Sequence, residues 1–157
     1  MTRSVSFSIS SVLDASRADV WTRVTSQPGL DHEFSPVLRM RFPRAHRGST
    51  IDDLRVGEPV GRAWLLLGGL LPVEYDDLCL VEVEPGSHFV ERSTLGSARN
   101  WQHERRLHDV GDGTRLTDTV TLTPRQPVPA GAARVVVAAV FRHRHRRLRA
   151  WFGSAGE

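Results

Sequence analysis

Between Ile51 and Thr123 the sequence is a succession of short β-strand patterns separated by turn-forming residues. The expected strands are residues 51–57, 60–68, 73–83, 87–94, 100–109 and 114–123. Glycine and proline separate several of them, as in Gly68-Gly69 with Pro72, Glu84-Pro85-Gly86-Ser87 and Gly111-Asp112-Gly113. Strands joined by turns of this kind pair antiparallel, so the succession predicts an antiparallel meander at the centre of the fold.

The residues before the meander predict one more strand and a short helical segment. Val5, Phe7 and Ile9 alternate with serines, which is typical of a half-buried strand. Ser16-Arg-Ala-Asp19 has the pattern of a capping box and predicts a helix that begins at Ser16. Gln27-Pro28-Gly29 is expected to end that helix. Leu30–Pro36 is expected to form a short helix or turn, and Val37–Phe42 a second strand.

After the last strand, one long helix is expected from about Ala130 to Phe152, with proline before it and Gly153 after it. Its apolar stripe consists of Val137, Val140, Phe141, Leu148, Trp151 and Phe152. The helix must bury this stripe against the sheet. The fold class is therefore α+β, with the antiparallel sheet covered on one side. The length of 157 residues suits a single domain, expected at 1–153, followed by a tail at 154–157.

Composition excludes several classes of protein. Cys79 is the only cysteine, so no intramolecular disulfide can form. The sequence contains no lysine, which excludes a Schiff base and a phosphate-binding loop that needs lysine. The first ten residues have no apolar run typical of a signal peptide. The longest apolar run, Ala63–Leu71, is far shorter than the roughly 20 residues of a membrane-spanning helix. We therefore expect a soluble, cytoplasmic protein.

The charge is unevenly distributed along the chain. The net charge is +3 and the isoelectric point is about 10.3. The isoelectric point is this high because all the basic residues are arginine, which keeps its positive charge up to very high pH. Residues 1–124 carry 14 Arg and 17 acidic residues, and residues 125–157 carry 7 Arg and one acidic residue. We interpret the basic C-terminal segment as a solvated helix face and expect no nucleic-acid partner. A small adaptor that contacts acidic lipid or RNA through this face is a third hypothesis.

Several segments resemble a bacterial ligand-binding group of the SRPBCC superfamily, which includes START domains, Bet v 1-like proteins and polyketide cyclases. These segments are Leu30-Asp-His-Glu33 with Pro36 and Arg39-Met40; Leu65–Gly68 with Leu71-Pro72; Phe89–Ser93; Trp101–Arg105; Leu116–Asp118; and Phe141–Leu148. The resemblance implies a helix-grip fold. In that fold an antiparallel sheet curls around a long C-terminal helix, two short helices follow the first strand, and an internal pocket holds an apolar small molecule.

Strand parity brings a set of charged residues to one interior. Glu91 shares a face with Phe89, His103 and Arg105 share a face with Trp101 and Leu107, and Asp118 shares a face with Leu116 and Val120. Arg144 lies close to the centre of the helix stripe. The set Glu91, His103, Arg105, Asp118 and Arg144 could bind a polar group of a ligand, with His103, Asp118 and Glu91 as candidate catalytic residues. The alternative is a buried salt-bridge network that only joins strands to helix.

Other residues are candidates for the pocket wall. Trp64, Tyr75, Phe89 and Trp101 could form aromatic walls, and an ordinary core role is the alternative for each. Glu33 and Met40 match the group pattern and could line the entrance of the cavity. The preferred interpretation is that Glu33 anchors a loop and Met40 belongs to the core.

No metal site or cofactor is expected. His32-Glu33 lacks the second histidine of a zincin helix, and His143 and His145 diverge on a helix. Cys79 lies in an apolar strand and is expected to be a buried, inert thiol. The leading hypothesis is binding of a hydrophobic small molecule, such as a lipid, a polyketide or an aromatic compound, between the sheet and the C-terminal helix. The alternative is an enzyme of cyclase or dehydratase type that acts on a polyketide-like or aromatic substrate.

Overall fold

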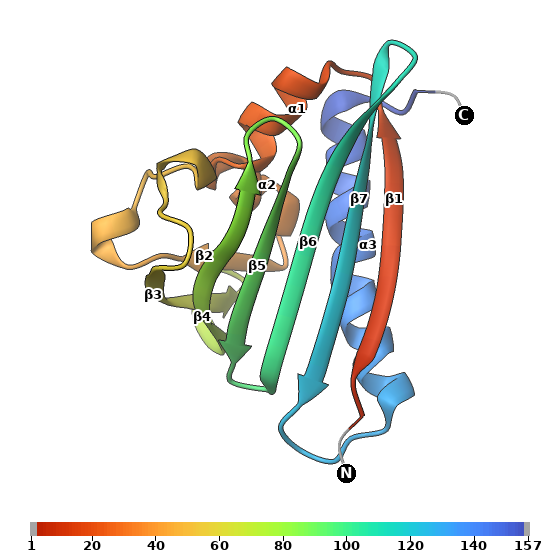
Figure 1. Cartoon of the computed structure of the whole chain (residues 1–157). Helices are drawn as coiled ribbons and strands as arrows, with labels where there is room; N and C mark the ends of the chain where they lie inside the picture. Colours follow the sequence, from red (N-terminus) through yellow and green to blue (C-terminus); the bar gives the residue numbers. More distant parts are fainter. Residues whose placement is uncertain (1–2, 156–157) are drawn as a thin grey trace.

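The computed structural model describes residues 3–155, which form one seven-stranded antiparallel sheet and three α-helices (Figure 1). The strand order is β1-β7-β6-β5-β4-β3-β2. The strands are β1 Val5–Leu13, β2 Leu38–Arg41, β3 Pro59–Leu67, β4 Leu71–Glu84, β5 His88–Leu95, β6 Ala98–Val110 and β7 Gly113–Pro124. Strands β3 to β7 form the predicted meander, and β1 pairs antiparallel with β7 at the edge of the sheet.

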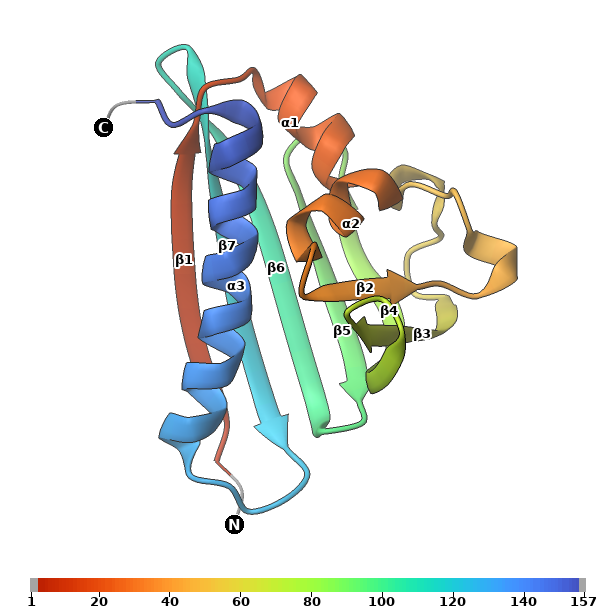
Figure 2. The same ribbon diagram turned by 180° about the vertical axis from the view of Figure 1, so that it is seen from behind.

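The helices cover one face of the sheet. Helix α1 spans Arg17–Val24, α2 spans Gln27–Phe34 and α3 spans Ala130–Phe152. Figure 2 shows α3 running along the sheet beside β1 and β7, with α1 and α2 placed between α3 and the β2–β4 side. This arrangement is the predicted helix-grip fold, with two short helices after the first strand. None of the described helices combines the length and apolar character that crossing a membrane requires.

The break between α1 and α2 differs from the prediction. Ser16 caps α1 as predicted, because its hydroxyl accepts a hydrogen bond from the Asp19 N–H. Helix α1 already ends at Val24, however, and Gln27-Pro28-Gly29 begins α2 instead of ending α1. Ser26 caps α2, and Pro28 lies in its first turn, where a missing N–H costs no helical hydrogen bond.

The predicted strand at 51–57 is wrong. Residues Ile51–Asp53 form a 3-10 turn, preceded by a similar turn at Arg44–His46. Asp53 accepts a hydrogen bond from the Thr50 N–H, and Asp52 accepts one from the Trp21 indole at 3.0 Å. These side-chain hydrogen bonds favour a turn over a strand. Ile51 packs against the core from the turn.

The core consists of two clusters on the helix-covered face. One gathers around Leu13, Val20, Trp21, Leu107 and Leu116, and the other around Phe7, Val120 and Phe141. Phe141 and Leu148 of the predicted helix stripe are 2% exposed, whereas Trp151 is 53% exposed.

Trp151 leaves the stripe because it packs elsewhere. The Arg23 guanidinium lies 3.6 Å from its ring centre and the His32 ring lies 5.1 Å away. It therefore packs against α1 and α2 at the end of α3.

The C-terminal end returns to the sheet. Ser154 pairs with Leu13, and the Ala155 N–H donates to the Val12 carbonyl. Of the predicted tail at 154–157, residues 156 and 157 lie outside the described residues.

Candidate functional site

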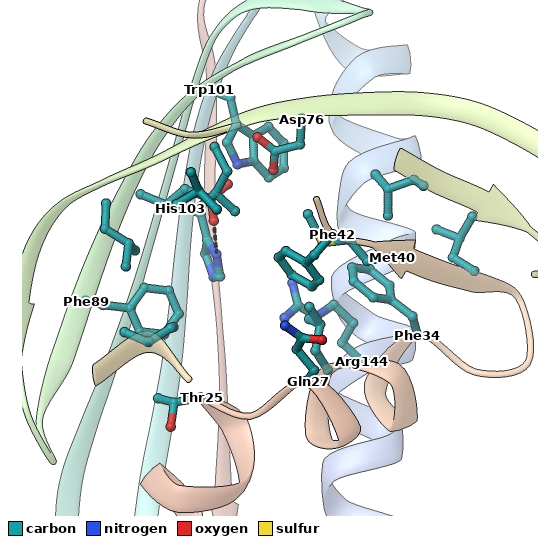
Figure 3. Close-up of a pocket in the computed structure, with 18 of the residues that line it drawn as sticks. Thr25, Gln27, Phe34, Met40, Phe42, Asp76, Phe89, Trp101, His103 and Arg144 are labelled. Atoms are coloured by element: carbon teal, nitrogen blue, oxygen red, sulfur yellow. Dashed lines mark ion pairs between the residues drawn. The ribbon is translucent and has the colours of Figure 1, made fainter. Parts of the chain in front are cut away.

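A cavity of about 320 Å³ lies between the helices and the β2–β6 part of the sheet (Figure 3). Its wall is mostly apolar and includes Val24, Leu30, Phe34, Met40, Phe42, Leu54, Leu78, Leu80, Phe89, Trp101, Val137, Val140 and Phe141. Figure 3 shows Trp101, His103 and Phe89 on one side of the cavity and Phe34, Met40 and Arg144 on the other. An apolar wall of this kind suits a ligand with a large hydrocarbon surface.

Ionisable side chains interrupt the apolar wall, and the buried ones are Asp76, Glu91, His103 and Arg144. They come from β4, β5, β6 and α3. Glu91 and His103 are directly opposite each other in the β5–β6 pair, which places both on the cavity face. The His103 ring packs edge-on against Phe89 and Phe141, with ring centres 5.6 and 5.0 Å apart.

Behind this wall, Arg105 is the centre of a buried ionic network. It lies opposite Asp118 in the β6–β7 pair and is fully buried. Its Nε and one Nη donate to Asp118 at 2.7 and 2.8 Å, and its two Nη groups donate to Glu33 at 3.0 and 2.8 Å. One guanidinium therefore binds two carboxylates in bidentate fashion, which is the strongest geometry for such a pair.

Arg144 completes the charge balance of this network. Its Nε donates to Glu33 at 3.1 Å, and its guanidinium lies 4.8 Å from the ring centres of Phe34 and Phe141. Glu33 is the anchor of α2, because its carboxylate binds α2 to both β6 and α3. Two arginines thus face two carboxylates, and the buried charges cancel.

Two histidines fill the remaining acceptor positions of Asp118. The Nε2 atoms of His103 and His145 lie 2.7 and 2.8 Å from its two oxygens. Because an ionised carboxylate can only accept, Nε2 carries the proton in both rings. In His145, Nδ1 is within hydrogen-bond distance of the Ser11 hydroxyl at 2.8 Å, and Arg149 donates to that hydroxyl at 2.7 Å. In His103, Nδ1 faces the Glu91 carboxylate at 4.0 Å.

The network keeps its carboxylates ionised. Burial alone would raise the pKa of Asp118, but Arg105 and His103 hold this pKa well below its usual range. Burial opposes ionisation of Glu33 in the same way, and Arg105 and Arg144 lower its pKa. The pKa of Arg105 is raised by Asp118 and Glu33 against the effect of its burial. The network is therefore charged and fully hydrogen-bonded around Asp118.

The Asp76–Glu91 pair has the opposite environment. Asp76 is 6% exposed, and its Oδ1 has no hydrogen-bond partner among residues 3–155. Burial raises the pKa of Asp76 well above its usual value, and the neighbouring Glu91 raises it further. Glu91 accepts a hydrogen bond from the Ser93 hydroxyl at 3.1 Å. The cavity wall therefore holds a carboxyl group whose ionisation is disfavoured.

The structure brings together most of the predicted site residues. Glu91, His103, Arg144, Phe89, Trp101 and Met40 line the cavity, whereas Arg105, Asp118 and Glu33 lie in the network behind it. Glu33 is 1% exposed and lies within the network, not at the entrance of the cavity. The pleat accounts for the inward orientation of Arg105 and Asp118, as strand parity predicted.

Trp64 and Tyr75 are not walls of the described cavity. They are cross-strand partners in β3 and β4, their rings pack 5.6 Å apart, and the Arg62 guanidinium lies 3.7 Å from the Tyr75 ring centre. The β4 residues that line the cavity are even-numbered, such as Asp76 and Leu78, so the pleat directs Tyr75 to the opposite face.

Sequence reasoning missed Asp76, Ser11 and His145. The alternation of β4 places Asp76 on the same face as Leu78 and Leu80, and this signal was present in the sequence. Ser11 follows a run of outward-facing serines and gave no comparable signal. His145 is offset from the centre of the helix stripe, and only the position of Asp118 under α3 explains its complete burial.

The basic run His143–Arg147 is mainly an anchor for α2, and is less solvated than predicted. His143 Nε2 lies 2.9 Å from the Ser35 carbonyl oxygen, and Arg147 donates to the His32 carbonyl at 3.0 Å. Basic side chains at the last carbonyls of a helix satisfy its free acceptors. Arg144 and His145 point inward, and Arg146 is exposed. Among the described residues, no group of three or more His, Cys, Asp or Glu side chains is placed to hold a metal ion.

Solved structures with the same fold cover nearly the whole chain. Protein CV1439 from Chromobacterium violaceum superposes with a TM-score of 0.72 at 14% identity, over 96% of this chain and 99% of that one. A START superfamily protein from Mycobacterium smegmatis gives a TM-score of 0.68 at 12% identity, over 94% and 96%. DynU16, described as a protein of the dynemicin biosynthetic locus, gives 0.62 at 16% identity, over 97% of this chain and 49% of that one. These similarities confirm the predicted helix-grip fold, which the START superfamily protein shares.

The sequence also matches one family model. The model is described as a domain of unknown function, DUF8410, and it matches residues 11–152. No curated protein matches the sequence. The matched range contains every residue of the cavity and the buried network named above, and the chain belongs to this family.

Proposed function

We propose that this member of the DUF8410 family binds a hydrophobic small molecule in the cavity between its sheet and α3. The observation that carries the proposal is the mostly apolar cavity of about 320 Å³, with a few ionisable side chains in its wall. An apolar wall provides affinity by removing hydrocarbon from water, and the few polar groups orient the molecule. A lipid, a polyketide or an aromatic compound has the required surface.

The buried network supports this function by keeping the cavity open. Arg105 joins β6, β7 and α2, and Arg144 joins α2 to α3 through the same Glu33. These bonds fix the helices at a distance from the sheet without filling the space between them. A close-packed core would instead collapse onto apolar side chains.

A filling substitution tests the proposal. Leu78 lines the cavity and is 8% exposed, so Leu78→Trp is expected to occupy ligand space and weaken binding of a neutral naphthylamine dye about tenfold or more. Val73 is on the same strand and 51% exposed, so Val73→Trp is the matched control and should bind as the wild type does. Dye binding by wild type should also raise the Tm, because the dye binds the folded state.

Two outcomes would contradict the proposal. One is wild-type protein that does not bind the dye or any alkyl probe at micromolar concentration. The other is a Leu78→Trp variant that folds and binds as tightly as wild type. Native mass spectrometry of gently purified protein is a second readout, in which a retained small molecule should be lost from the Leu78→Trp variant.

A specific observation favours catalysis as the second candidate function. Asp118 lies against His103 Nε2 and orients the ring, so Nδ1 is the ring nitrogen on the side of Glu91 and the cavity, where it can exchange a proton with a substrate. A cyclase or dehydratase acting on a polyketide-like or aromatic substrate requires such a base. The DynU16 structure, from a biosynthetic locus, shares the fold at 16% identity.

His103→Gln separates catalysis from binding. Glutamine retains polarity but cannot titrate near neutral pH. If the protein is an enzyme, turnover should fall by about 10²-fold or more while the affinity for substrate changes little. If the protein only binds, neither the variant nor the wild type should turn over substrate. The affinity of the variant for each probe should then differ only slightly from that of the wild type.

A further inference from the structure

The polar end of the cavity carries an acidic pair without a balancing cation. In the network behind it, Arg105 and Arg144 balance Glu33 and Asp118. Among residues 3–155, the nearest nitrogen base to Glu91 is His103 Nδ1, 4.0 Å from its carboxylate, and no salt bridge involves Asp76. Among the described residues, neither carboxyl group of this pair is therefore neutralised by an arginine.

The groups that face this pair come from each surrounding element. From β4, Glu74 lines the cavity, but its oxygens accept from the N–H groups of Tyr75 at 2.9 Å and Ser97 at 3.2 Å. From β6, His103 is bound to Asp118, and from α3, Arg144 is bound to Glu33. The Oδ1 of Asp76 has no such partner in the described structure, and it is buried. It is the free acceptor of the site.

We propose that the cavity takes an apolar molecule that carries a protonated amine, whose ammonium group binds at Asp76 and Glu91. This inference rests on the proposed function and names the class of ligand. An ammonium group has three donors, which suits the unpartnered Asp76 Oδ1 and the Glu91 carboxylate, to which Ser93 already donates one hydrogen bond. Its hydrogen bonds to carboxylates are charge-assisted and shielded from water by the apolar wall. The hydrocarbon part of the ligand then lies along that wall.

Proton release accompanies this binding. In the free protein Asp76 favours its neutral form because burial and Glu91 raise its pKa. When the ammonium group binds, the Asp76 carboxyl group loses its proton to the solvent, and the product is an ion pair of ammonium with carboxylate. The affinity for an amine should therefore rise with pH over the range in which Asp76 of the free protein is protonated, and fall again where the amine loses its proton near pH 10.

Three probes with the same alkyl chain test the inference: decylamine, decanol and decanoic acid. Calorimetric titration at pH 8 should show decylamine binding about tenfold or more tightly than decanol, and decanoic acid binding more weakly than decanol. Titration in buffers of different ionisation enthalpy, at a pH below the Asp76 titration midpoint, should show proton release with decylamine only.

Matched variants locate the effect. Asp76→Asn and Glu91→Gln together should abolish the preference for decylamine while decanol still binds. Asp77→Asn is the control, because Asp77 is the next residue on β4 but faces outward to Arg62 at 2.8 Å. That variant should keep the wild-type preference.

Each outcome decides between the two proposals. Equal binding of the three probes, or a preference for decylamine that persists in the double variant, would overturn the amine inference and leave the proposed function standing. Binding of none of the three probes to wild type would overturn both. If the double variant does not fold, the wild-type comparison and its proton release still decide the question.

Discussion

Two buried acidic clusters lie close together on the same face of the sheet, and their environments are opposite. Glu33 and Asp118 are held by two arginines and two histidines in a network without exposed side chains. Asp76 and Glu91 face the cavity, and one oxygen of Asp76 lacks any partner among the described residues. Burial opposes ionisation in both clusters. Arginine in bidentate contact offsets this effect of burial for Glu33 and Asp118, and no arginine does so for Asp76.

The difference separates structure from function. A saturated network has no free acceptor for a ligand, so Arg105, Asp118 and Glu33 are assigned to the scaffold. An unsaturated pair in an apolar cavity retains its capacity for hydrogen bonds, so Asp76 and Glu91 are the groups that we propose for ligand binding. Four substitutions or conditions test this division, from the largest expected effect to the smallest.

Arg105→Met should have the largest effect on stability. It leaves Asp118 and Glu33 buried without their main cation, and we expect a loss of about 3–5 kcal/mol in the free energy of unfolding, measured by urea denaturation. Arg106→Met is the matched control, because the neighbouring arginine is on the exposed face of β6. Equal stability of the two variants would show that the network does not hold the helices.

Acid should destabilise the protein through the same network. Because the pKa values of Asp118 and Glu33 are lowered in the folded state, their contribution is fully present above the usual carboxyl range, about pH 4–5. It is lost as pH falls through the lowered values, where the unfolded chain binds more protons. Urea midpoints between pH 7 and pH 3 should show this loss in wild type and a smaller one in Arg105→Met. Parallel curves would contradict the assignment.

Ser11→Ala tests the far end of the network. The substitution removes the hydroxyl between His145 and Arg149, and an unsatisfied buried group costs about 1–3 kcal/mol. Ser10→Ala is the control on the exposed face, where the hydroxyl pairs with Thr117. We expect the Ser11 variant alone to lower the Tm clearly, and a similar Tm for both variants would argue against a continuous network.

Asp76→Asn should change stability least, and in the opposite direction. Because the pKa of Asp76 is raised in the folded state, its ionisation opposes folding above its ordinary pKa, and an amide removes this penalty. The variant should have a higher Tm than wild type at pH 7, and the gain should vanish near pH 4. A lower Tm at pH 7 would show that Asp76 has a structural partner.

Sequence patterns predicted the charged interior but not its division into two clusters. The period of two residues in β6 and β7 placed Arg105 and Asp118 inward, because strand parity is fixed by the pleat. Parity gives no register between strands, so the direct pairs Arg105–Asp118 and Glu91–His103 came only with the structure. Nor does it say which carboxyl groups an arginine reaches.

The remaining differences arise where tertiary contacts act on short segments. The turn at Ile51–Asp53 depends on Trp21, which is far away in sequence, and this partner cannot be found from local strand propensity. His145 is buried because Asp118 lies beneath α3, although its helical position is off the apolar stripe. The inward orientation of Asp76 follows from the alternation of β4, by the same strand parity that placed residues of β5, β6 and β7.

The most direct test of the division between the two clusters is a carboxyl carbon NMR titration of Asp76 and Asp118 in the same sample. The structure predicts that the Asp76 midpoint lies well above its usual value of about 3.9 and that Asp118 stays ionised to well below it. Addition of decylamine should lower the Asp76 midpoint and leave Asp118 unchanged. An Asp76 that titrates at or below its ordinary pKa in the free protein would contradict the account.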